Sequence, residues 1–247
     1  AWHHYLGLGF GLFAFTWSLS GMLAVDPWGW PGQRAELPGR LGPAKGLDLQ
    51  AFRRPPAAAA AALADRGLRP RSLARVQVGQ RPWYVAHGAE GETRLVSAAG
   101  PLAVRRRLDR DQLLAAVTDR LGREVVTGAQ WLRRADGHYY PGRAVRLGQD
   151  RLRWPVLRVR LARPAAARLY LDPHTGEVVR RVDAAARRER WLDTGLHRLD
   201  PPFLTANRGL WYPLVLLLLI GGTVLTASAA VVGARWLARR RRGRQRA

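Results

Sequence analysis

The chain has 247 residues, a formal net charge of +23 and no cysteine. The length allows one sizeable domain or two small ones. The lack of cysteine excludes disulfides, thiolate metal sites, iron–sulfur clusters and covalent c-type haem attachment, so a metal or cofactor must be held by histidine, carboxylate or backbone groups. Among the 41 basic residues only Lys45 is a lysine, which indicates a codon bias in the source genome. Since no recognition motif is present, we predict no nucleic-acid partner.

An uncharged apolar run near the N-terminus predicts a first transmembrane helix over residues 1–25. The run from Tyr5 to Val25 has 21 residues, and about 20 are needed to cross a lipid bilayer. Only a helix satisfies its own backbone hydrogen bonds there. A buried helix of a soluble core and a cleaved signal peptide are the alternatives. The run is too long for a signal sequence, follows no Lys or Arg and lacks a small-x-small cleavage site, which favours a retained helix.

Small residues recur along one face of this first helix. At steps of three or four residues the face consists of His4, Gly7, Gly11, Ala14, Ser18 and Gly21. One interpretation is a packing stripe, because small residues let helices approach closely. The other is a haem slot, in which the His4 imidazole ligates the iron and the glycines leave room for the flat porphyrin. His3 points about 100° away from His4 and is the second choice of ligand.

The segment between the two apolar runs predicts a linker and then an α+β domain. Residues 26–46 are rich in Pro and Gly and form the predicted linker, and residues 47–195 form the predicted domain. A helix beginning near Pro55 precedes the first strands, and a helix with Asp109 as its N-cap precedes the others. The predicted strands are Arg71–Val78, Pro82–His87, Thr93–Ser97, Glu124–Leu132, Leu152–Leu161, Arg168–Leu171 and Glu177–Val182. A helix followed by several strands, twice, is typical of an α+β domain with antiparallel sheet. No nucleotide-binding loop or hydrolase motif is present.

A histidine stands before the second apolar run, within the predicted connector of residues 196–209. His197 lies in the segment Gly195–Asp200 (GLHRLD). It can be a surface residue of the connector or a haem ligand. His4 and His197 should be separated by the thickness of the membrane, so they cannot ligate one iron together, and each needs a second ligand from elsewhere.

A second uncharged run, Leu210–Ala234, has 25 residues and predicts a second transmembrane helix over residues 210–234. The core of this helix has no ionisable residue, which argues against a stand-alone transporter. Residues 235–247 form a tail with several arginines and no acid. Because a basic juxtamembrane cluster stays in the cytoplasm, both termini are expected inside and the central domain outside.

Several segments, taken in their order, resemble the inner-membrane PepSY-associated transmembrane (PepSY-TM) family. They are Trp2–Leu8 (WHHYLGL), Gly11–Phe13 (GLF), Ser20–Leu23 (SGML), Asp26–Trp28 (DPW), Trp154–Val159 (WPVLRV), Tyr170–Val178 (YLDPHTGEV), Arg190–Leu192 (RWL), Gly195–Asp200 (GLHRLD), Leu210–Trp211, Gly221–Thr223 and Trp236. The chain departs from the family pattern at Asp193–Thr194 and at Pro201. The resemblance implies a PepSY-like domain in the periplasm and a multi-pass location in the bacterial inner membrane. Family members usually have four transmembrane helices, so it also implies the C-terminal half of a full-length member, working with a second membrane half or as a homo-oligomer.

The resemblance implies a first function. Some family members resemble haem b reductases that pass electrons across the inner membrane to ferric siderophores. This chain would then be part of a haem-bearing electron carrier for iron acquisition, a component of a ferric-siderophore reductase. Non-covalent haem b would be bound through His4 or His197, with His3 as the alternative.

A second function is a non-catalytic, membrane-anchored PepSY module that binds a protein partner, for example in regulating a peptidase. It is motivated by the lack of any hydrolytic or redox constellation in the central domain. His87, His138 and His174 are expected to be solvated, and Tyr139–Tyr140 near Asp136 are expected to pack rather than to react.

Overall fold

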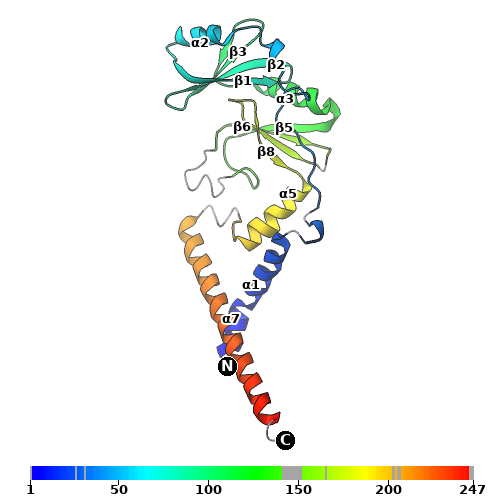
Figure 1. Cartoon of the computed structure of the whole chain (residues 1–247), viewed down its shortest axis with the longest axis vertical. Coiled ribbons are helices and arrows are strands. Elements are labelled where there is room, and N and C mark those ends of the chain that lie inside the picture. The colour runs from blue at the N-terminus through cyan, green and yellow to red at the C-terminus, as the bar shows by residue number, and fades with distance from the viewer. Residues whose placement is uncertain are drawn as a thin grey trace. The chain divides into compact units, whose positions relative to one another are not determined.

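The computed structural model describes residues 2–25, 27–30, 32–140, 152–164, 166–201, 204 and 207–244. The chain divides into two compact units (Figure 1). The helical unit comprises Ala1–Gln33 and Ala185–Ala247, and the α+β unit comprises Arg34–Ala184. Two long apolar helices at the ends therefore flank an α+β region with antiparallel sheets, as the sequence predicts.

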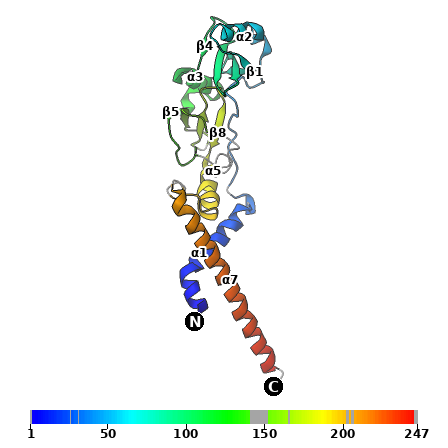
Figure 2. The same cartoon turned by 90° about the vertical axis from the view of Figure 1, so that its left-hand side faces the viewer.

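The helical unit contains the two long helices and a short helical connector. Helix α1 spans Trp2–Ala24 and helix α7 spans Arg208–Arg244. They cross within this unit, and α7 continues well past the N-terminal end of α1 (Figure 2). The shorter elements are the 3₁₀ turn η1 (Pro27–Gly29), helix α5 (Ala184–Glu189) and the π-helical segment η4 (Arg190–His197).

Both long helices have the length and composition of membrane spans. The segments Trp2–Ala24 and Gly209–Arg242 have mean hydropathies of 1.5 and 2.4, and only 6% of the apolar window of each is buried within the protein. A core helix of a soluble domain would bury its apolar face. The exposure of these helices therefore argues against the alternative of a buried core helix.

The α+β unit repeats one arrangement, a helix followed by a four-stranded antiparallel meander. Helix α2 (Pro56–Ala64), after the 3₁₀ turn η2 (Leu49–Ala51), precedes a sheet in the order β1-β2-β3-β4. Helix α3 (Arg110–Leu121) and the 3₁₀ turn η3 (Arg123–Val125) precede a sheet in the order β5-β6-β7-β8. The strands are Pro70–Val78, Arg81–Gly88, Thr93–Ser97, Val104–Arg105, Val126–Leu132, Val156–Leu161, Arg168–Leu171 and Val178–Val182.

Local sequence signals account for the element boundaries. Asp109 caps α3 through a complete capping box, in which its carboxylate accepts the backbone N–H of Gln112 and the Gln112 side chain accepts the N–H of Asp109. The two-residue turn at Gly79–Gln80 joins β1 to β2. In the turn between β7 and β8, Asp172 accepts the N–H of His174, and Gly176 adopts a positive φ of 73°.

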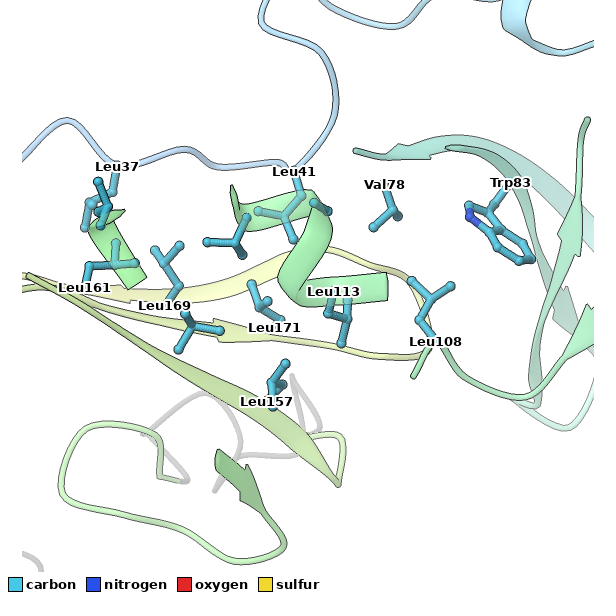
Figure 3. Close-up of a cluster of buried hydrophobic side chains, with 14 of the residues drawn as sticks. Leu37, Leu41, Val78, Trp83, Leu108, Leu113, Leu157, Leu161, Leu169 and Leu171 are labelled. Carbon is cyan, nitrogen blue, oxygen red and sulfur yellow. The ribbon is translucent and has the colours of Figure 1, made fainter. Parts of the chain in front are cut away.

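One hydrophobic core joins the two sheets and α3 (Figure 3). Trp83, Val85 and Leu95 reach it from the first sheet, and Leu157, Val159, Leu161, Leu169 and Leu171 reach it from the second. The opposite face of the first sheet packs Tyr84, Ala86 and Val96 against Ala59 and Leu63 of α2. The first sheet is thus buried on both faces, which explains the nearly continuous burial of β2.

The predicted domain boundaries require correction on both sides. The predicted linker, residues 26–46, contains Leu37 and Leu41, whose side chains are buried in the core, so the α+β unit begins at Arg34. At the other end the unit stops at Ala184, because residues 185–195, predicted as part of the domain, pack in α5 and η4 with the helical unit. The predicted tail after residue 234 stays helical to Arg244, with the guanidinium of Arg240 4.3 Å from the centre of the Trp236 ring.

Candidate functional site

The imidazole of His197 rests on the C-terminal end of α1. Its ring stacks on Trp17 with the centroids 5.6 Å apart and the planes at 17°. Gly21 lies beneath the ring, and a Cβ at this position would be 3.0 Å from the His197 Cε1 atom. The Nε1–H of Trp17 donates to the His197 carbonyl at 3.0 Å. The small residue at position 21 therefore gives room to a histidine of the same chain.

The hydrogen bonds of His197 define which ring nitrogen is available. Nδ1 lies 3.2 Å from the carbonyl oxygen of Trp17 and 3.4 Å from Oγ of the buried Ser20. A carbonyl oxygen can only accept, so Nδ1 carries a proton, and in the neutral imidazole Nε2 then has the lone pair. This tautomer, in which Nδ1–H is bound to a carbonyl, is the usual state of a metal-ligating histidine.

The connector is attached to both long helices around this histidine. While Trp17 of α1 binds the carbonyl of His197, the indole N–H of Trp211 on α7 donates to the carbonyl of Leu199 at 2.5 Å. Asp193 of η4 is buried and pairs with Arg198 at 3.1 Å. The backbone that carries His197 is therefore held at three points.

The two histidines at the other end of α1 have different surroundings. Nδ1 of His3 lies 2.8 Å from Oγ of Ser228, so His3 faces α7. His4 is exposed and has an edge contact with Tyr5, with the ring centroids 6.0 Å apart. On the face that His4 shares with Gly7 and Gly11, a Cβ added at either glycine would meet nothing within 4 Å. This part of the small-residue face is open.

The contact between α1 and α7 uses aromatic side chains of α1 against glycines of α7. A Cβ at Gly221 would be 2.2 Å from the Phe10 ring, and one at Gly222 would be 3.5 Å from the Phe13 ring. A groove of about 490 Å³ follows beside this contact. Its lining comprises Phe13, Ala14, Trp17, Ser18, Leu219, Gly222, Thr223, Thr226, Ala227 and Ala230, without a histidine. The small face of α7 thus packs on α1, whereas the small face of α1 packs only in part.

These placements decide how a haem could fit. Gly21, under His197, is 17 residues from His4, which corresponds to about 25 Å along a helix. One iron therefore cannot be shared by His197 and His4, as predicted. Each imidazole could therefore offer one ligand, at its own end of the helix pair. The groove between the helices offers no ligand of its own.

In the described residues, no group of three or more His, Asp and Glu side chains could hold a metal ion. His174 is a turn residue whose Nδ1 lies 2.9 Å from the Arg106 carbonyl oxygen. His138 is 8% exposed, so the expectation that it is solvated is wrong. His87 lines a hollow beside the first sheet.

A partly buried polar cluster around Asp136 was not predicted. Oδ1 of Asp136 accepts the backbone N–H groups of His138 and Tyr139 at 2.8 and 2.7 Å. Oδ2 accepts the Tyr170 hydroxyl at 2.9 Å and the Arg158 guanidinium at 3.0 Å. Tyr139 also stacks on Tyr170 with the centroids 5.3 Å apart, so Tyr139 packs as expected. The turn at Asp136 is thereby fastened to β6 and β7.

The cluster shifts two pKa values in opposite directions. Burial by itself would raise the pKa of Asp136, but hydrogen bonds from the backbone of Tyr139 and His138, and from Tyr170 and Arg158, lower it below its ordinary value. The pKa of Tyr170 is raised by burial and by the negative charge of Asp136. Asp136 therefore stays ionised and Tyr170 stays protonated, which suits a structural clamp.

The edge strands of the two sheets are covered to different extents. Segment 34–48 lies along β8 and the end of β1, with Arg40 bridged to Glu177, Ala35 N–H bound to Asp183, and Gly79 N–H bound to the Leu41 carbonyl. In the described part of the chain, the backbone of residues 71–76 in β1 has no partner other than β2. Most of the outer edge of β1 is therefore open to hydrogen bonding, and part of segment 34–48 faces Ala74–Gln77 across a hollow.

No family model, curated protein or solved structure matches this chain.

Proposed function

We propose that this chain is part of a haem-bearing transmembrane electron carrier in the bacterial inner membrane, where it serves the reduction of ferric siderophores for iron acquisition. One observation carries the proposal: the His197 imidazole is fixed at one end of the long helix pair with Nε2 available, while His4 stands on an open face at the other end. The ordered motifs that resemble the PepSY-TM family support the same function.

In this proposal each histidine has a defined task. His197 would provide Nε2 as a ligand of the iron, with its ring oriented by the Trp17 carbonyl and the Trp17 ring. His4 would be the ligand at the opposite end, beside Gly7 and Gly11, where a flat group can approach the backbone. His3 is the weaker candidate because Ser228 already binds its Nδ1. Haem b, when bound, supplies one-electron transfer at each end.

The proposed orientation follows from charge. The arginine-rich end of α7 would lie in the cytoplasm, and the α+β unit and His197 on the periplasmic side. The α+β unit would then be placed to meet the ferric siderophore. Since each end of the helix pair offers a single ligand, a second membrane half or a second copy of the chain would complete both sites.

The test is a visible spectrum of the full chain, produced with haem supplementation and purified in detergent. We expect a Soret band that shifts on reduction by dithionite and a molar mass of at least two protomers. His197→Ala should remove the absorbance of one haem site and His4→Ala that of the other, so that each variant keeps about half of the bound haem. The matched control is His174→Ala, which changes a turn histidine of the α+β unit and should leave the spectrum unchanged.

Two results would contradict the proposal. One is a folded, haem-supplemented protein without a Soret band. The other is a Soret band of equal strength in His197→Ala, His4→Ala and the control His174→Ala. A loss of absorbance in His3→Ala alone would move the ligand assignment at that end to His3.

A second candidate function, the binding of a partner protein by the α+β unit, is favoured by the open outer edge of β1. An uncovered sheet edge presents backbone donors and acceptors that a second chain can pair with. Peptide binding that is equal with and without haem in the helical unit would show that partner binding does not depend on the haem function.

A further inference from the structure

The open edge of β1 has a defined hydrogen-bonding pattern. In a two-residue hairpin the residues that close the turn exchange both backbone hydrogen bonds, and the pattern then alternates along the strands. Val78 pairs with Arg81 at the turn, so Val76 and Ala74 also bond to β2. The N–H and C=O groups of Leu73 and Arg75 therefore point away from the sheet.

Hollows adjoin this edge on the core side of the sheet. A hollow of about 350 Å³ is lined by Ala74, Val76, Val85, His87, Tyr139, Leu152, Arg153, Asp172, Thr175, Glu177 and Val179. A second hollow of about 240 Å³ shares Ala74, Val76 and Glu177 with it and extends to Leu41 and Leu47 of segment 34–48. The side chains of Ala74, Val76 and Val85 share one face of the sheet, because Ala74 pairs directly with Val85. The hollows therefore lie beside the open stretch of the strand.

The opposite face of β1 carries positive charge. Arg75 is exposed and alternates with Ala74 and Val76, so it lies on the other side of the pleat. Arg71, also exposed, stands at the bulge where the regular pairing of β1 begins. Arginines on an edge strand discourage pairing with a second strand of like charge. They attract an acidic one, so the charge on this edge selects the partner.

We propose that the outer edge of β1, from Arg71 to Val76, binds an extended acidic segment of a partner protein, which adds to the first sheet as a fifth strand. The proposal rests on the second candidate function and specifies its site and ligand. Backbone groups of Leu73 and Arg75 provide the hydrogen bonds. In the added strand, residues opposite Ala74 and Val76 place apolar side chains over the hollow, and the residue between them places a carboxylate beside Arg75.

The test measures the binding of a fluorescein-labelled, eight-residue peptide of alternating valine and glutamate to the full chain in nanodiscs, by fluorescence polarisation. In an antiparallel pair the residues opposite Leu73 and Arg75 turn their N–H groups toward β1, and these are the glutamates. N-methylation of every glutamate amide should therefore weaken binding at least tenfold, whereas N-methylation of every valine amide should leave it within about twofold. A valine–lysine peptide should bind at least tenfold more weakly than the valine–glutamate peptide.

Variants of the chain test the same edge from the other side. Arg75→Pro removes the outward N–H and the charge, and proline is tolerated where the N–H of an edge strand faces solvent. We expect at least tenfold weaker binding, with a smaller loss for Arg75→Ala, and a reversed preference toward the valine–lysine peptide for Arg75→Glu. The matched control is Arg105→Glu on β4, at the opposite edge of the same sheet. Near-UV circular dichroism verifies that each variant is folded.

The outcomes separate the site from the function. The edge assignment is overturned if the two N-methylated peptides bind equally, or if Arg75→Glu changes binding no more than Arg105→Glu does. Partner binding by this unit would still stand in either case. No saturable binding up to about 1 mM peptide overturns both. A concentration-dependent dimer that Arg75→Pro abolishes, and that excludes the peptide, assigns the edge to a second copy of the chain and overturns the proposal.

Discussion

Gly176 offers a sharp test of the packing of the α+β unit, because a side chain there meets two separate obstacles. Its φ of 73° lies in the left-handed region, which costs an alanine about 1–2 kcal/mol. A Cβ would also lie 2.2 Å from Cγ2 of Val78, a side chain that is buried in the core between the sheets. Carbon atoms pack at about 3.5–4 Å, so Val78 must move by more than an ångström, and overpacking of this kind costs about 1–3 kcal/mol. Gly176→Ala should therefore lower the free energy of unfolding by about 2–5 kcal/mol.

The assay is urea unfolding of the full chain in detergent, followed by near-UV circular dichroism of the α+β unit. Gly91→Ala is the matched control, since Gly91 has a φ of 84° and nothing within 4 Å of an added Cβ, so it should lose only about 1–2 kcal/mol. In a Val78→Ala background, which removes Cγ2, the cost of Gly176→Ala should fall toward that of Gly91→Ala. The reasoning is refuted if Gly176→Ala costs no more than the control, or if Val78→Ala gives no relief.

Two other predictions concern the buried polar cluster and the helix pair. Asp136→Asn should lower the free energy of unfolding at pH 7 by about 1–3 kcal/mol, because Arg158 loses its charged acceptor. Since the pKa of Asp136 is lowered in the folded state, its contribution to stability is full above the ordinary value of 3.8 and is lost as the pH falls through the folded-state value. The urea midpoints of variant and wild type should therefore converge in acid. A difference that stays constant with pH would count against this. Gly221→Ala would bring a Cβ within 2.2 Å of the Phe10 ring and should destabilise the helix pair by about 1–3 kcal/mol in far-UV circular dichroism melts in detergent. Gly233→Ala, with nothing within 4 Å, should be neutral, and equal melts for the two variants would disprove the close contact.

Much of the architecture could be read from local patterns. The two uncharged runs predicted both long helices, and the Asp109–Gln112 pair predicted the start of α3, because capping and apolar length act within a few residues. The core that joins the two sheets could not be read in this way, since its contacts link residues far apart in the chain. The strand β4, which pairs with its neighbour β3, was missed because two residues are too few to show a strand pattern.

The candidate site also combines features that the sequence predicts with features that depend on contacts between distant residues. The sequence identified His4 and His197 as the candidate histidines and predicted that they lie at opposite ends of the two long apolar helices. It could not show that His3 binds Ser228 or that His197 stacks over Gly21. Nor could it show the four hydrogen bonds that converge on Asp136, because Arg158 and Tyr170 lie more than 20 residues along the chain.

By itself the sequence determined properties that depend on neighbours in the chain: the helical segments, their apolar surfaces, the arginine-rich end of α7 and the lack of thiol chemistry. The tertiary structure decided which surfaces remain available. Segment 34–48, predicted as a linker up to residue 46, covers β8 and the end of β1 and leaves the outer backbone groups of residues 71–76 without a partner in the described chain. The rings of Phe10 and Phe13 pack against the glycines of α7, whereas no described residue packs against Gly7 and Gly11 on the face of His4. Burial is set by contacts between distant segments, so only the folded chain separates a packing surface from a binding surface.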